Sequence, residues 1–199
     1  MIHVNKQPEP ANFHANVRLK GLKYLADHGI DPNKPLPPKT ILSTCWRDCL
    51  DEMYTLYDGT CAYLAVHFER VTGAGSVDHF IAKSPMPSRA YDWPNYRLAC
   101  SKMNSCKREY DDVLDPFLLA DGWFHVDLVS GRVFANPEST AAETTQIDAA
   151  IVRLGLDQPG CREMRGRHYL EYCQGEYTEA FLKKRSPFVW MEANRQGLL

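Results

Sequence analysis

Residues 76–84, SVDHFIAKS, set a carboxylate and an imidazole side by side, at Asp78 and His79, within a short apolar run. Neighbouring side chains on a strand point to opposite faces, so both groups can serve one site only where the strand ends. Imidazole can exchange a proton near neutral pH, and a carboxylate can bind a hard cation. The pair therefore suggests acid–base or metal chemistry, although an ordinary polar strand end is the alternative.

Positive charge is concentrated around this pair. Residues 83–108 contain six basic residues and one acid, which are Lys83, Arg89, Arg97, Lys102, Lys107, Arg108 and Asp92. A local basic stretch of this kind is typical of a site for an anionic substrate, whereas a solvated surface of mixed charge is the alternative. The net charge of the whole chain is -2, which is not that of a nonspecific nucleic-acid binder.

The elements that must position these residues can be predicted from patterning. Residues 76–82 read as a strand, 83–95 as a proline-containing loop, 96–99 as a second strand and 100–112 as a helix. Further helices are expected over 11–29, 40–58, 138–154 and 161–184, and a hairpin over 122–136 with its turn at Ser130 and Gly131. The fold class is therefore α+β. We divide the chain into an N-terminal arm and helix (1–39), a core with its preceding helix (40–120), and a hairpin with C-terminal helices packing on the core (121–199).

The order Asp78-His79, Asn95, then Asn104 followed by Lys107 resembles the motif of the HNH endonuclease family, in the variant whose third residue is Asn. The matching segments are VDHFIAKS, WPNYRLAC and MNSCK. The resemblance implies a ββα-metal (HNH, or His-Me finger) core with flanking helices, to which this chain adds a β-hairpin. It also implies an enzyme that hydrolyses phosphodiester bonds with the help of a metal ion.

The motif assigns a role to each matching residue. His79 is expected to be the general base that deprotonates the attacking water. Asp78 and Asn104 are expected to supply the oxygen ligands of Mg²⁺ or Mn²⁺, since hard cations prefer oxygen and retain several waters. The cation would stabilise the negative charge that develops in the transition state.

The remaining motif residues have supporting roles. Asn95 is assigned to catalysis indirectly, because in the family the central Asn bridges the loop by hydrogen bonds and thereby orients the His. Lys107 is expected to contact phosphate, with Lys83 and Arg97 as further substrate contacts. Tyr91 and Trp93 could stack on a base, but packing in the core under the loop is the favoured interpretation.

Many HNH proteins also hold a structural zinc with two C-x-x-C pairs. The corresponding segments here are CAYL (61–64) and CSKM (100–103), in which Leu64 and Met103 replace the second cysteine of each pair. Because two thiolates do not complete a tetrahedral zinc site, we predict no structural zinc. The seven cysteines are odd in number and irregularly spaced, so reduced thiols are expected rather than a disulfide framework. No signal-like segment or long apolar run is present, so a cytoplasmic location and no membrane association are expected.

A narrower resemblance spans roughly residues 50–160. The segments LYDGTCAYL, LDPF, GRVFANP and IVRLGL, together with the motif, are similar to the HNH proteins of bacterial anti-phage systems of the Septu and retron-associated type. This similarity implies a DNA-cleaving effector that works with an ATPase partner in a defence complex. Two alternatives remain open: a nuclease with the same site that cuts RNA such as tRNA, and a non-catalytic assembly or binding subunit that uses the fold as a scaffold.

Overall fold

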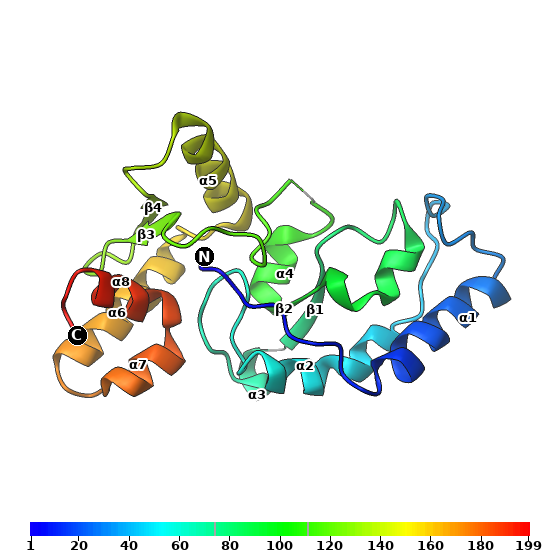
Figure 1. The fold of residues 1–199 in the computed structure, drawn as a ribbon, viewed down its shortest axis with the longest axis horizontal. Coiled ribbons are helices and arrows are strands. Elements are labelled where there is room, and N and C mark those ends of the chain that lie inside the picture. Colours follow the sequence, from blue (N-terminus) through cyan, green and yellow to red (C-terminus); the bar gives the residue numbers. More distant parts are fainter. Residues whose placement is uncertain (74, 111) are drawn as a thin grey trace. The chain divides into compact units, whose positions relative to one another are not determined.

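The computed structural model describes residues 1–73, 75–110 and 112–199, and it combines helices with two small antiparallel sheets (Figure 1). The predicted α+β class is confirmed. The chain divides into two compact units that alternate along the sequence. We call Lys6–Thr60 with Phe68–Asp112 the N-terminal unit, and Met1–Asn5 with Cys61–His67 and Val113–Leu199 the C-terminal unit.

The N-terminal unit contains a β-hairpin and several short helices. Its elements in chain order are η1 (His14–Leu19), α1 (Lys20–Asp27), η2 (Cys45–Cys49), α2 (Leu50–Leu56), α3 (Arg70–Gly73), β1 (Gly75–His79), η3 (Pro87–Tyr91), η4 (Trp93–Asn95), β2 (Tyr96–Cys100) and α4 (Ser101–Lys107). The helix predicted over 11–29 is confirmed as η1 and α1, of which α1 ends at Asp27, and Gly29 follows with a left-handed φ of 64°. The helix predicted from residue 40 begins only at Cys45, and Leu42 is buried from a segment without regular secondary structure.

The order of strand, loop, strand and helix around the predicted site is confirmed. Strands β1 and β2 are antiparallel, with Asp78 opposite Arg97 and His79 opposite Tyr96. Helix α4 follows β2 directly and packs against both strands (Figure 1). It ends at Lys107 rather than at residue 112, because Arg108 has φ 51° and ψ −129°, outside the helical region.

The aromatic residues of the loop between β1 and β2 belong to the core of this unit. The Phe13 ring packs edge-on against Trp93 and Tyr96, with centroids 5.4 and 5.5 Å apart. A Cβ at Gly21 would lie 2.1 Å from the Tyr91 ring, so only glycine allows α1 to approach η3 this closely. Tyr91 and Trp93 are both buried, which confirms their expected packing role.

The C-terminal unit consists of a second hairpin and four helices. Its elements are β3 (Phe124–Val126), β4 (Val133–Ala135), α5 (Ala141–Leu154), α6 (Pro159–Cys173), α7 (Glu179–Arg185) and α8 (Pro187–Arg195). The predicted hairpin is confirmed, and α5 begins at a capping box formed by Thr140 and Glu143. The single helix predicted over 161–184 is wrong: Gly175 adopts φ 78° after α6, and the Thr178 side chain caps a new helix, α7. No helix in the described ranges has the length and apolar character needed to cross a membrane.

Candidate active site

A cavity of about 390 Å³ opens in the N-terminal unit where β1, α4 and the start of the η2–α2 segment meet. Four residues of the predicted set line it: Asp78, His79, Lys83 and Asn104. They come from the end of β1, the loop after it and the middle of α4. The hairpin and the helix that follows it therefore bring the expected base and the expected metal ligands to one place.

The His79 imidazole is fixed within the wall of this cavity. Its side chain belongs to a residue only 7% exposed, and its Nε2 lies 3.0 Å from the Ala90 carbonyl oxygen. A carbonyl can only accept, so Nε2 carries the proton and Nδ1 is the proton-accepting nitrogen. The ring is also held edge-on by Trp46 and Tyr96, at centroid distances of 4.9 and 5.2 Å.

Burial lowers the pKa of His79 from its ordinary value of 6.5 to about 3, and the positive charge of Lys83 acts in the same direction. The hydrogen bond to the Ala90 carbonyl opposes this change, and the charge of Lys107 adds to it. The ring is consequently neutral at physiological pH. A neutral imidazole with an accepting Nδ1 has the protonation state of a general base, while a pKa this far below neutrality makes it a weaker base than an unperturbed histidine.

Asn95 secures the loop that carries the Ala90 carbonyl. Its Nδ2 donates to the carbonyl oxygens of Ile81 at 3.0 Å and Arg89 at 2.9 Å, and its Oδ1 accepts from the Ile81 amide at 2.7 Å. Asn95 is buried and does not line the cavity. It can therefore influence His79 only through the backbone, by holding the segment that contains Ala90.

Asp78 and Lys107 form a buried ion pair behind the cavity wall. The two residues are 1% and 0% exposed, and Lys107 Nζ lies 3.7 Å from Asp78 Oδ2. The same ammonium donates to the carbonyl oxygens of His79 at 3.0 Å and Phe80 at 2.9 Å. Lys107 thus ties α4 to the end of β1, and its ammonium points inward rather than towards a phosphate in solvent.

Arg97 also lies away from the cavity. Its guanidinium donates to the carbonyl oxygens of Pro94 at 2.8 Å and Tyr96 at 2.9 Å, and it packs over the Phe80 ring at 4.9 Å. Every residue of β2 is buried, so a side chain from this strand does not reach the surface. The expected substrate contacts of Lys107 and Arg97 are therefore corrected: both residues support the hairpin from inside.

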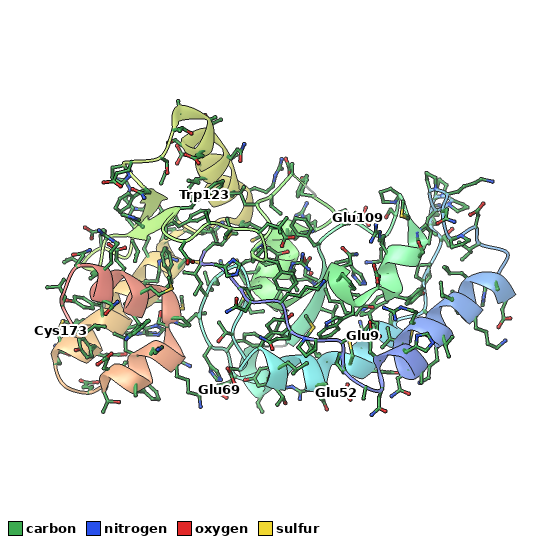
Figure 2. All side chains as sticks on the ribbon, in the orientation of Figure 1. Glu9, Glu52, Glu69, Glu109, Trp123 and Cys173 are labelled. Atoms are coloured by element: carbon green, nitrogen blue, oxygen red, sulfur yellow. The ribbon has the colours of Figure 1, made fainter. Side chains whose placement is uncertain are left out.

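The basic groups that do line the cavity are Lys83, Arg47 and Arg108. Sequence reasoning missed Arg47 and Trp46, because no local pattern sets these two residues apart from the rest of the helix predicted there. Among the described residues of the lining, Glu109, which follows α4 (Figure 2), is the second acid besides Asp78, and its carboxylate accepts a hydrogen bond from Ser84 Oγ at 2.7 Å. The positive groups thus come from three separate segments.

The donor set suits a hard cation that keeps most of its own water. The carboxylate of Asp78 and the amide of Asn104 both belong to residues of the cavity wall, and Asn104 Nδ2 donates to Ser76 Oγ at 2.9 Å. This bond leaves Asn104 Oδ1 as the atom that would meet a cation. No group of three or more His, Cys, Asp or Glu side chains in the described ranges is arranged to hold a metal. Water and substrate oxygens would therefore complete the sphere of Mg²⁺ or Mn²⁺.

The two positions that interrupt the C-x-x-C pairs, Leu64 and Met103, are both buried, each within its own unit.

The sequence matches no protein-family model, and the comparison with curated proteins found no relative.

Proposed function

We propose that this protein is a metal-dependent endonuclease of the HNH type that hydrolyses phosphodiester bonds of DNA. In this proposal β1, β2 and α4 form its ββα-metal core. The observation that carries the proposal is the state of His79, a buried neutral imidazole fixed through Nε2 in the wall of a cavity that Asp78 and Asn104 also line. A histidine that served packing alone would not need to border a polar cavity beside two oxygen donors.

In the proposed reaction His79 Nδ1 accepts a proton from the water that attacks phosphorus. The Ala90 carbonyl holds the ring in the required tautomer, and Asn95 holds the loop that presents this carbonyl. Asp78 and Asn104 would hold the cation, which as a Lewis acid would supply stabilisation of the charge that develops on the phosphate and the leaving oxygen. Lys107 keeps the Asp78 carboxylate in place from behind.

The substrate contacts proposed here are Lys83, Arg47 and Arg108, in place of the two buried basic residues. Each lines the cavity, and together they supply positive charge beside an acidic metal ligand. Contacts of this kind position a phosphate backbone without reading its sequence. The resemblance to Septu and retron-associated proteins further suggests a cytoplasmic effector of anti-phage defence that works with an ATPase partner, and both points remain part of the proposal.

A direct test is cleavage of a supercoiled plasmid and of single-stranded DNA with Mg²⁺ or Mn²⁺, by the full chain alone and with a co-purified ATPase partner if one is found. Removing a general base typically slows the reaction by about 10²–10⁴-fold, so His79→Ala should lose cleavage by that factor. His14→Ala is the matched control, because His14 is exposed and does not line the cavity. Equal cleavage by wild type and His79→Ala would overturn the mechanism. Absence of both cleavage and Mn²⁺ binding by calorimetry would overturn the enzymatic proposal, and single-stranded RNA assayed in parallel separates the two polymers.

A further inference from the structure

Trp46 forms an aromatic wall of the cavity directly beside the proposed base. Its ring meets the His79 imidazole at 4.9 Å with an angle of 89° between the planes, and the Tyr91 ring lies 6.1 Å away at 35°. Trp46 is half-buried at the start of η2, and it lines the cavity. A large flat side chain is therefore partly accessible beside the His79 ring.

The other aromatic residues around the site cannot provide such a surface. Tyr91, Trp93 and Tyr96 are all buried in the core of the unit. Among the described residues that line the cavity, the aromatic rings are those of Trp46 and His79. His79 is already engaged by the Ala90 carbonyl, so Trp46 is the ring that a ligand can meet.

A cation lies over the same ring. Lys83 Nζ is 5.4 Å from the centroid of the Trp46 ring, a distance at which the ammonium is attracted to the π-face. This is a weak interaction, and a phosphate offers the ammonium a stronger partner. A nucleotide in the cavity could thus exchange places with Lys83: its base would take the indole face, while its phosphate would take the ammonium.

We infer that Trp46 is a stacking platform for an unpaired base next to the scissile phosphate, so that the substrate is single-stranded DNA or a strand whose bases are locally unpaired. This inference rests on the proposed nuclease function. A base within a duplex has both faces stacked and must be extruded before it can meet an indole. A cavity of about 390 Å³ lies near the lower end of the range for small-molecule sites, so it offers room for a single base beside Trp46.

The test measures binding without catalysis. The full chain is titrated in EDTA against a fluorescent 12-mer oligothymidylate, and against the same strand annealed to oligodeoxyadenylate, with anisotropy as the readout. Stacking on one aromatic residue corresponds to about a 5- to 150-fold change in affinity on its removal. Trp46→Leu should weaken binding of the single strand by a factor in that range and change duplex binding less than two-fold. Trp46→Phe should retain most of the affinity, because phenylalanine keeps a π-face.

Trp190→Leu is the matched control. Trp190 in the C-terminal unit is also half-buried and also carries a lysine ammonium over its ring, with Lys183 Nζ 4.1 Å from the centroid, but it does not line this cavity. Its substitution should leave single-strand binding unchanged. Thermal melting of each variant confirms that the chain is folded, and Trp46→Phe keeps the test usable if the leucine variant unfolds.

Three results would overturn the inference: equal loss of single-strand and duplex affinity in Trp46→Leu, no loss in that variant, or no binding of the single strand by the wild type. These results are distinct from failure of the nuclease proposal, which would appear as an absence of metal-dependent cleavage. If the chain binds the single strand through Trp46 but does not cleave it, the stacking role of Trp46 stands and the nuclease proposal is refuted.

Discussion

The buried ion pair behind the cavity provides the sharpest test of how the site is built. Lys107→Met removes the ammonium while keeping a long, flexible and apolar side chain at the same place in α4. The change leaves the Asp78 carboxylate, which is 1% exposed, without the charge that lies 3.7 Å away. It also removes the donor to the carbonyl oxygens of His79 and Phe80.

The expected loss of stability in Lys107→Met follows from the distance between the two charges. Two unit charges 3.7 Å apart attract by about 4.5 kcal/mol at an effective dielectric constant of 20. Measured losses on removing one partner of a buried pair are about 3–5 kcal/mol, because the remaining charge stays uncompensated. We therefore expect Lys107→Met to lower the free energy of unfolding by about 3–5 kcal/mol, a large part of the roughly 5–15 kcal/mol of a typical domain.

Urea unfolding followed by circular dichroism at pH 7 measures this loss. Lys102→Met is the control, since Lys102 is an exposed lysine on the same helix and should change stability by less than about 0.5 kcal/mol. The double variant Asp78→Asn with Lys107→Met should be more stable than Lys107→Met alone, because it removes both charges of the pair. A loss below about 1 kcal/mol in Lys107→Met, or a double variant no better than the single one, would refute the reasoning.

Three further predictions concern the base, the loop and the mouth of the cavity. Because burial lowers the pKa of His79 to about 3, kcat/KM for cleavage should show no acidic limb between pH 7 and pH 5, and a limb near pH 6.5 would contradict the lowered pKa. Asn95→Ala removes three hydrogen bonds of 2.7–3.0 Å and should lower the free energy of unfolding by about 2–4 kcal/mol and reduce kcat more than it changes KM. Arg108→Gly should raise the free energy of unfolding in urea by about 1 kcal/mol, because φ 51° with ψ −129° strains a non-glycine residue. The same variant should bind DNA more weakly, as measured by fluorescence anisotropy. A destabilised variant would count against the strain.

The lowered pKa of His79 also determines how the stability of the fold changes with pH. The folded pKa of His79 lies below its unfolded value of 6.5, so protons bind more readily to the unfolded chain between these two values. His79 therefore reduces stability progressively as the pH falls from 6.5 towards 3. His79→Gln, which does not titrate, should show a shallower loss of unfolding free energy over this interval.

The arrangement of strand, loop, strand and helix was predictable because its signals are local. The apolar run around Asp78 and His79, the prolines of the following loop and the helix-forming composition after Cys100 each mark an element without reference to tertiary contacts. The proximity of Asn104 to the end of β1 then follows from a helix that packs back on its hairpin.

Other features depend on packing that a single sequence does not reveal. A lysine one turn after Asn104 is expected at the surface, because lysine is rarely buried without a partner, and here the partners are Asp78 and two backbone carbonyls. Arg97 was misjudged for the same reason, since its acceptors are backbone oxygens of nearby residues. Trp46 is separated from His79 by 33 positions in the sequence, and only the folded chain brings the two rings to 4.9 Å.

One buried positive charge resolves a conflict between neighbouring residues of the site. Asp78 and His79 are adjacent in the chain, yet a metal ligand must remain a carboxylate while a general base must remain an uncharged imidazole. The Lys107 ammonium lies beside the carboxylate at 3.7 Å, and its field also helps to lower the pKa of the imidazole, an effect in which burial and Lys83 have the larger part. The same charge thus attracts the Asp78 carboxylate and opposes protonation of His79. A basic residue hidden behind the cavity can therefore be as important to the proposed chemistry as one that meets the phosphate.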